Sequence, residues 1–313
     1  MSIHGTMTIM DIAVTGSSGL VGTALMTKLR GDGHRAIALV RRQPNAGGDE
    51  IRWDPAGGTI DAASLEGIDG VIHLAGAGIG DKRWSEERKK VLVESRTKGT
   101  ALLAETLAGL TKAPSAFVSG SAIGYYGSRG DEELTEASSK GAGFLADLVD
   151  KWELAAKPAQ DAGIRVAFAR TGIVMSKRGG ALGKQLPLFK LGVGGRFGSG
   201  KQWQSWVSID DEVAALVWLL TNDVAGPVNI TAPNPVTNNE FTKTLGKVLG
   251  RPTLLPVPLI GPKLLFGAEL VDEMLLASQR ITGNTLTAAG YPWIYPDLEP
   301  ALTDIVGRTK EMA

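Results

Sequence analysis

The chain has 313 residues, 43% of them hydrophobic and 21% charged, and its 33 basic residues balance its 33 acidic ones. This length suits about two domains, or one large α/β unit with an extension. A formal net charge of zero gives no overall field that would attract nucleic acid or an anionic membrane, so we expect neither as a partner. The sequence contains no cysteine, which excludes disulfides, thiolate nucleophiles and cysteine-bound metal clusters.

The start of the chain, MSIHGTMTIM, is too polar and too short for a signal peptide. Residues 1–8 therefore read as a leader without regular structure. No apolar run reaches the ~18–20 residues of a transmembrane helix. The histidines, His4, His34 and His73, are too scattered for a metal site and suit ordinary turn or core positions. We expect a cytoplasmic protein without a bound metal.

From residue 9 to residue 171, short apolar runs alternate with longer amphipathic stretches. The runs predict strands over 10–15, 35–40, 70–75, 116–119 and 165–170, and the stretches predict helices over 22–31, 86–110 and 144–162. Nearly continuous apolar strands separated by helices indicate a parallel sheet covered on both faces. The predicted fold is therefore α/β, with a Rossmann-type doubly wound parallel sheet.

A glycine motif, Gly16-x-x-Gly19-x-x-Gly22, lies directly between the first strand and the first helix. In this setting the first glycine allows a tight turn, the second lets the backbone approach a pyrophosphate, and the third lets the helix pack on the strand. The N–H groups of the first helical turn would then face the phosphates. We predict that a dinucleotide contacts Gly16, Ser17, Ser18, Gly19, Leu20 and Val21. The alternative is an ordinary strand–helix turn that contains glycines.

The second strand ends as LVRRQ over 39–43, without the Asp or Glu that usually binds the adenosine ribose of NAD. Arginine binds phosphate through bidentate, charge-assisted hydrogen bonds. We therefore expect Val40, Arg41 and Arg42 to contact NADP(H), with both guanidinium groups near the 2′-phosphate. The alternative is a solvated arginine pair. The next strand ends at Leu74-Ala75-Gly76, where the small residues Ala75 and Gly76 would let the chain pass close to the same cofactor.

Further motifs narrow the family. They are Trp53-Asp54-Pro55, Arg83-Trp84-Ser85, Ser95-Arg96-x-x-x-Thr100, SGSAIGYYG over 119–127, Arg170-Thr171-Gly172, WVSIDD over 206–211 and a C-terminal block over 249–302. Together with the glycine loop, they resemble the atypical extended short-chain dehydrogenases/reductases called NAD(P)-dependent epimerase family proteins. Members of that family carry a C-terminal domain of unknown function, and some are labelled cell-division-inhibitor homologues.

This resemblance implies an NADP(H)-binding fold in which Arg96 reaches the cofactor from the long helix; a solvated helix charge is the alternative. Ser119 and Arg170 lie near strand ends and are candidates for cofactor contacts, although Arg170 is equally well interpreted as a structural cap. We divide the chain into an NADP-binding Rossmann domain over 9–175, to which 200–231 returns, and a smaller, mainly substrate-side α+β subdomain over 176–313. The glycine-rich segment 176–196 is expected to be a loop over a site, or a hinge.

Short-chain dehydrogenases normally work with a Tyr-x-x-x-Lys pair, in which the ammonium group lowers the phenol pKa. The helix that should carry this pair reads FLADLVDKWE over 144–153, and Lys151 follows Asp147 instead of a tyrosine. The remaining catalytic candidates are Ser121, Tyr125 and Tyr126, which follow a strand's carboxyl end, where ligands bind in such sheets. A phenol without a lysine neighbour suits a neutral proton donor. The alternative for both tyrosines is packing.

Several charged and aromatic residues are candidates for a pocket that takes an anionic or planar small molecule. They are Arg83, Trp84, Arg196, Lys201, Trp203 and Trp206, and the alternative is surface charge with core tryptophans. Two functions follow: an NADP(H)-dependent oxidoreductase or epimerase-like enzyme with non-standard acid–base residues, or a catalytically weak or inactive NADPH-binding sensor or scaffold. The sequence does not identify the substrate, and it does not distinguish a monomer from a homodimer.

Overall fold

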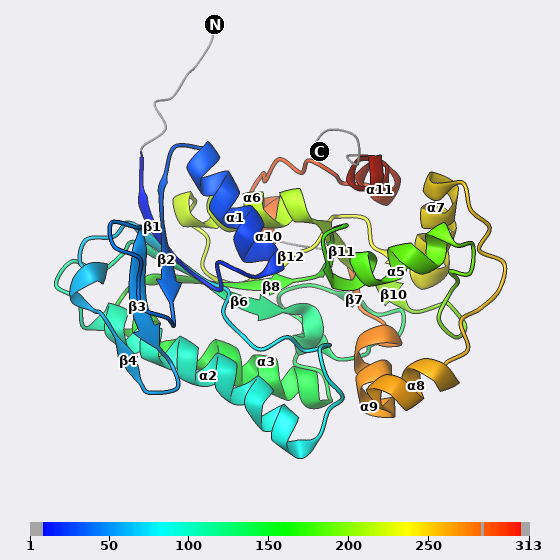
Figure 1. Ribbon diagram of the computed structural model, residues 1–313, viewed down its shortest axis with the longest axis horizontal. Helices are drawn as coiled ribbons and strands as arrows, with labels where there is room; N and C mark the ends of the chain where they lie inside the picture. The colour runs from blue at the N-terminus through cyan, green and yellow to red at the C-terminus, as the bar shows by residue number, and fades with distance from the viewer. Residues whose placement is uncertain (1–8, 283–284, 308–313) are drawn as a thin grey trace, which may run out of the picture.

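A computed structural model describes residues 9–282 and 285–307, so the expected leader lies outside the described residues. The centre is an eight-stranded sheet in the order β12-β8-β6-β5-β1-β2-β3-β4 (Figure 1). Its strands are β1 (Asp11–Thr15), β2 (Arg35–Val40), β3 (Glu50–Asp54), β4 (Thr59–Ile60), β5 (Gly70–His73), β6 (Ala116–Ala122), β8 (Arg165–Thr171) and β12 (Gly226–Ile230). Neighbouring strands run parallel, except that β4 is antiparallel to β3.

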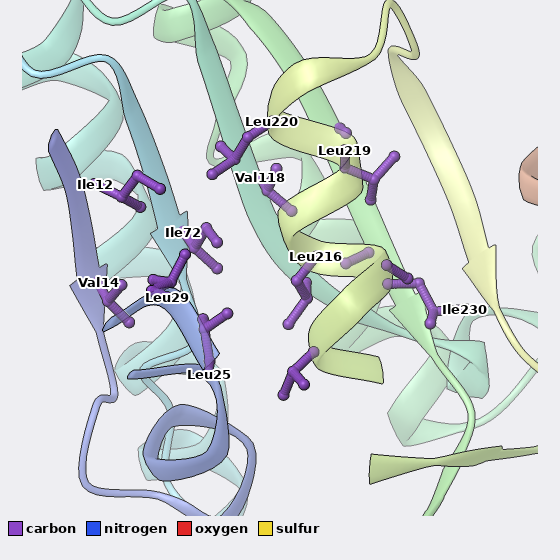
Figure 2. Close-up of a cluster of buried hydrophobic side chains, with 14 of the residues drawn as sticks. Ile12, Val14, Leu25, Leu29, Ile72, Val118, Leu216, Leu219, Leu220 and Ile230 are labelled. Atoms are coloured by element: carbon purple, nitrogen blue, oxygen red, sulfur yellow. The ribbon is translucent and has the colours of Figure 1, made fainter. Parts of the chain in front are cut away.

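Helices cover both faces of this sheet, which confirms the doubly wound α/β fold. On one face lie α1 (Leu20–Gly31) and α6 (Ile209–Thr221), and on the other lie α2 (Glu86–Ala108), α3 (Phe144–Leu154) and α4 (Lys157–Asp161) (Figure 1). Because successive strand residues point to opposite faces, Ile12 and Val14 pack toward α1 and α6 while Ala13 faces α2. Figure 2 shows Leu25 of α1 and Leu216 of α6 in the first of these cores.

Two local expectations were wrong. The helix expected over 144–162 is interrupted between α3 and α4, because Pro158 has no N–H to continue the hydrogen-bond ladder and its ring crowds the preceding turn. The segment 176–196 is not simply a loop, since it contains α5 (Gly180–Lys190). The side chains of Leu182, Leu186 and Phe189 recur at helical spacing there and are buried. Farther along the chain, α6 is capped by Ser208, whose side chain accepts from the Asp211 N–H.

Strands β3 and β12 were not predicted. Strand β12 begins Gly226-Pro227, and a proline is compatible with a strand only where it lies at an edge or bulge; β12 is an edge strand, paired with β8 alone. Its position places part of 200–231 in the large sheet. The proposed domain boundary near residue 175 stays a prediction.

The rest of the chain packs beside the carboxyl ends of the large sheet's strands. A separate core joins α5, α7 (Asn238–Leu249) and α11 (Leu298–Gly307). Two-stranded pairs are formed by β9 (Ile173–Met175) with β11 (Trp206–Ser208), β10 (Trp203–Gln204) with β13 (Val236–Thr237), and β7 (Glu133–Leu134) with β14 (Arg280–Ile281). The remaining turns and short helices are η1 (Ala63–Leu65), η2 (Ile123–Tyr126), α8 (Ile260–Phe266), α9 (Ala268–Leu270), η3 (Val271–Leu275) and α10 (Thr285–Ala288). Within 9–282 and 285–307, every helix is too short or too polar to cross a membrane.

Candidate functional site

The glycine loop joins β1 to α1 and leaves no room for a side chain at Gly16 or Gly22. Gly16 has a φ of +68°, a conformation that L residues rarely adopt. A β-carbon on Gly16 would stand 2.8 Å from the Leu74 carbonyl carbon, and one on Gly22 would collide with the Gly16 carbonyl oxygen. The helix N-cap, Gly19, has no side-chain cap. The backbone N–H groups at this helix end therefore have no capping side chain in front of them, which suits an anion.

A buried polar chain holds this loop against the sheet and two helices. The Thr15 hydroxyl lies 2.7 Å from His73 Nδ1 and accepts from the N–H groups of Leu74 and Ala75. His73 Nε2 lies 3.0 Å from the Thr100 hydroxyl, which also accepts from Trp152 Nε1. Burial, with a smaller contribution from the Arg96 charge, lowers the pKa of His73 to about 4. His73 is thus a neutral structural residue, and the N–H groups at 74 and 75 are already bonded.

Arg96 carries the buried charge next to this loop. Its side chain lies on α2, and the residue is only 7% exposed. One Nη donates to the Leu92 carbonyl, and the guanidinium lies over the Trp152 ring, 5.0 Å from its centroid. Burial, and then the nearby Arg88 charge, lower the pKa of Arg96 to about 10. Its Nε is buried and has no hydrogen-bond partner among the described residues.

Arg96 and Gly76 are in close contact across this site. A β-carbon on Gly76 would stand 3.1 Å from the Arg96 guanidinium carbon. The guanidinium therefore reaches the exit of β5, where the chain also passes the glycine loop. A buried guanidinium with a spare donor beside a glycine-rich loop whose helix end has no side-chain cap fits a phosphate or ribose oxygen of a dinucleotide.

The two arginines after β2, both expected near the 2′-phosphate, differ in their partners. Arg42 makes a bidentate ion pair with Glu50, at 2.5 and 2.9 Å, and Glu50 also accepts from the Asn45 N–H. Its neighbour Arg41 is exposed and pairs with no acid in the described part of the chain. Val40 is half-buried at the end of β2. Of these two arginines, Arg41 therefore presents the guanidinium that has no acidic partner among the described residues.

Ser121, Glu153 and Arg170 form a buried cluster at the carboxyl ends of β6 and β8. The Ser121 hydroxyl donates to Glu153 at 2.5 Å, and Arg170 forms a bidentate ion pair with the same carboxylate, at 2.8 Å for each bond. Burial alone would lower the pKa of Arg170, but its bonds to Glu153 outweigh this effect and leave the pKa above its ordinary value. Ser119 is fully buried next to this cluster. The structure thus gives Ser121 and Arg170 internal partners.

The two tyrosines differ sharply in their surroundings. Tyr126 is fully buried, and its hydroxyl donates to Asn229 and accepts from Arg170. Burial raises the pKa of Tyr126 above its ordinary value. Tyr125 is half-buried and lies flat against Arg170, whose guanidinium carbon is 3.6 Å from the ring centroid. Tyr126 is therefore part of the interior, and Tyr125 is the tyrosine with accessible surface here.

A cavity of about 180 Å³ lies beside these groups, between α3, the end of β6 and the segment η3. Arg96 lines it at one side. The wall contributed by α3 consists of Leu145, Leu148, Val149 and Trp152, whereas Lys151 points away and is exposed. The face of α3 that meets the cavity is therefore apolar.

Most of the residues expected to form a substrate pocket lie elsewhere. Trp203 lines the cavity, but Trp206 is fully buried in the core with α5 and α7. Trp84 packs on Phe144 and donates to the Ile79 carbonyl. Arg83 and Lys201 are exposed and Arg196 is half-buried, all outside the cavity lining.

Sequence reasoning missed Glu153 and Gln204. Glu153 follows Trp152 on α3, and no local pattern shows that it pairs with Arg170 on a distant strand. Gln204 lies in a strand of two residues, too short for any periodicity to predict. Trp152 lies in the helix that the sequence predicts over 144–162. Its indole hydrogen bond to Thr100 could not be predicted, because the two residues are 52 positions apart.

The fold and the glycine loop define a Rossmann-type dinucleotide-binding protein of the extended short-chain dehydrogenase type. The sequence model of the NAD dependent epimerase/dehydratase family matches residues 12–231, and that of a domain of unknown function, DUF1731, matches residues 257–305. The chain belongs to this epimerase/dehydratase family, and the resemblance seen in the sequence is confirmed.

Relatives match nearly the whole chain. An epimerase family protein of Mycobacterium bovis is 42% identical over 292 residues, which cover 93% of this chain and 96% of the relative. The crystal structure of human epimerase family protein SDR39U1 with NADPH is 35% identical, with a TM-score of 0.86 over 95% of this chain and 99% of that one. A structure described as the nucleoside-diphosphate sugar epimerase of Corynebacterium glutamicum is 38% identical. Its TM-score is 0.78, over 96% of this chain and 59% of that chain.

Proposed function

We propose that the protein binds NADP(H) across the carboxyl ends of β1, β2 and β5, and that it is an oxidoreductase or epimerase-like enzyme of a small molecule. The observation that carries this proposal is the buried Arg96 guanidinium, which has a donor without a partner among the described residues and lies against Gly76. A buried charge without a counter-ion is costly, so its presence beside a dinucleotide loop supports a bound anion. We also propose that Gly16, Ser17, Ser18, Gly19, Leu20 and Val21 surround the pyrophosphate.

Preference for NADP(H) over NAD(H) is the finer part of this proposal. Strand β2 ends without an acid, and Arg41 presents an uncommitted guanidinium there. The human relative was crystallised with NADPH, which supports the same cofactor here. The Glu50 carboxylate is already paired with Arg42. We therefore assign binding of the 2′-phosphate to Arg41. Arg42 has the supporting role of holding the Glu50 carboxylate away from that phosphate.

The chain's own residues suit hydride transfer without the usual Tyr-x-x-x-Lys pair. The bound cofactor would supply or accept the hydride. None of the tyrosines of the sequence, at 125, 126, 291 and 295, has a lysine four residues later. The apolar wall of α3 excludes water from the cavity, and Arg96 would balance cofactor charge. Tyr125 follows the lining residues Ile123 and Gly124 but does not itself line the cavity. We assign it the role of holding and releasing a proton at the cavity's border, while Glu153 holds the Ser121 hydroxyl.

A second function is favoured by the same apolar wall. Leu145, Leu148 and Val149 stand where α3 faces the cavity, and none can transfer a proton. A protein that binds NADPH tightly but turns over slowly or not at all, as a sensor or scaffold, fits this wall equally well.

The two functions are separated by incubating the purified protein with NADPH and a panel of aldehydes and ketones while following nicotinamide absorbance. We expect oxidation of NADPH with at least one carbonyl compound, and a large loss of that rate in Tyr125→Phe but a small one in Tyr291→Phe. Tight NADPH binding without oxidation by any compound would refute the proposal of an enzyme and favour the NADPH-binding sensor or scaffold. Equal rates in Tyr125→Phe and the wild type would remove Tyr125 from the reaction.

A further inference from the structure

The cavity beside α3 has two different walls. The inner wall is formed by the strand-end residues Ala122, Gly172 and Ile173 together with Arg96, and it faces the large sheet and the proposed cofactor. The outer wall comes from β10, η3 and the segment after it. Its side chains are Trp203, Gln204, Glu273, Met274, Leu275, Ala277 and Gln279. The outer wall and α3 would therefore contact the substrate rather than the cofactor.

Most polar atoms of these walls already have partners. The Glu273 carboxylate accepts from the N–H groups of Phe144 and Leu145, at 2.9 and 2.8 Å. Gln279 Nε2 donates to the Ile123 carbonyl at 2.9 Å, and Trp203 Nε1 donates to Asp131 at 2.8 Å. Arg96 is the one cation among the lining residues, and it lies on the inner wall. The outer wall thus offers no positive charge to a ligand.

Gln204 is the exception among the partnered groups of the outer wall. Its Oε1 is buried and has no hydrogen-bond partner in the described ranges. A buried acceptor left without a partner costs free energy that a bound donor would recover. A hydroxyl group is the simplest match because it both donates and accepts, and so it would satisfy either orientation of the amide.

We propose that the substrate is a compact apolar alcohol, or the corresponding carbonyl compound, without a phosphate group; this rests on the proposed function. An apolar cavity of about 150 Å³ is large enough for benzene, so about 180 Å³ accepts one ring-sized group. A nucleoside diphosphate needs arginine, lysine or free N–H groups around its phosphates, and the outer wall has no such cation. The substrate class therefore differs from the sugar nucleotide named for the Corynebacterium glutamicum relative.

Calorimetric titration of cyclohexanol and of UDP-glucose into the NADPH-saturated protein tests this assignment. We expect cyclohexanol to bind with a dissociation constant on the order of millimolar or tighter, and UDP-glucose to give no heat of binding at the same concentrations. Tighter binding of UDP-glucose would overturn the proposal. The proposal would also be overturned if cyclohexanol bound to the cofactor-free protein but not to the NADPH-saturated protein, because the nicotinamide would then occupy the cavity.

Two variants connect the binding to named residues. Gln204→Leu should weaken cyclohexanol about fivefold to tenfold, and Ala277→Phe should abolish binding by filling the cavity. The matched control, Ala181→Phe, alters an exposed position of α5 outside the lining and should bind as the wild type does. Unchanged binding in both Gln204→Leu and Ala277→Phe would place the alcohol elsewhere and refute the site.

Each variant is first titrated with NADPH, so a misfolded protein is recognised by its lost cofactor affinity. If the wild type itself does not bind NADPH, the proposed function fails by that result alone. The alcohol and the sugar nucleotide are then compared on the cofactor-free protein, where the same preference for cyclohexanol is expected. A preference for UDP-glucose there would overturn the substrate assignment separately.

Discussion

The guanidinium carbon of Arg96 lies 3.1 Å from the point that a β-carbon on Gly76 would occupy. A glycine at 76 therefore makes room for a buried arginine, and the arginine reaches the loop that leaves β5. Neither residue alone indicates a cofactor. Their contact lies at the carboxyl ends of the strands, where the glycine loop also lies, and it places a charged donor where a dinucleotide would bind.

Gly76→Ala tests this contact. The added methyl group would push against Arg96, which is held from behind by Trp152, so we expect NADPH affinity to fall about tenfold through misplacement of the guanidinium. Gly109→Ala is the matched control, because its nearest neighbours would be 3.6 Å away, at ordinary contact distance. Isothermal titration measures both. Wild-type affinity in Gly76→Ala would show that Arg96 does not need its present position.

Arg96→Met should change stability and cofactor affinity in opposite directions. Methionine removes a buried charge without a counter-ion, so the cofactor-free protein should be as stable as the wild type or more so. NADPH binding should weaken by roughly 1.5–3 kcal/mol, the usual range for a hydrogen bond to a charged group. Chemical denaturation and NADPH titration measure the two effects. A loss of stability with unchanged NADPH affinity would contradict both expectations and make Arg96 a structural residue.

His73 makes the protein acid-sensitive. Burial lowers its pKa to about 4 from an ordinary 6.5, so the unfolded chain takes up a proton that the folded protein refuses. The free energy of unfolding should therefore fall as the pH drops from 6.5 toward 4, by about 3 kcal/mol in total. Urea denaturation across this pH range, in the wild type and in His73→Gln, measures the slope. An equally steep slope in His73→Gln would assign the effect to other groups.

Glu212 has the opposite pH dependence. Its residue is 1% exposed, one oxygen accepts from Thr171, and the other has no partner among the residues described. Burial raises its pKa to about 8, so the folded protein keeps a proton that the unfolded chain releases above an ordinary 4.5. The free energy of unfolding should therefore fall as the pH rises from 4.5 through 8, by roughly a few kcal/mol.

Glu212→Gln should remove that loss. We expect the variant to melt at a higher temperature than the wild type at pH 8 and at nearly the same temperature at pH 5, where Glu212 is protonated in the folded protein. Differential scanning calorimetry at the two pH values gives the comparison. A variant that is equally destabilised at both would indicate that glutamine does not fit this buried position.

The large sheet was predictable because its signals are local. The run over 11–15, the glycines after it and the amphipathic spacing of α1 follow one another directly in the sequence, and they fix a strand, a turn and a helix. The family resemblance rested on the same short motifs. Strand β3 was missed, and with it Glu50, which pairs with Arg42. The sequence therefore contained no sign that Arg42 has a carboxylate partner, and its contact with NADP(H) stays a prediction.

The interior of the candidate site could not be predicted, because its contacts join residues far apart in sequence. Ser121 and Glu153 are 32 positions apart, and Tyr126 and Asn229 are 103 apart. Each was visible as a polar residue near a strand end or a helix. Only the packing of α3 on β6 and β8 decides that Ser121 faces a carboxylate, and only the position of β12 decides that Tyr126 is buried.

The most direct measurement is the titration of NADPH and NADH into the wild type, Arg41→Ala and Arg42→Ala at one fixed ionic strength. We predict that the wild type prefers NADPH by about tenfold or more. Arg41→Ala should remove most of this preference with little effect on NADH, and Arg42→Ala should remove less, because that guanidinium is bound to Glu50. Equal wild-type affinities for NADPH and NADH would contradict the assignment of this site to NADP(H).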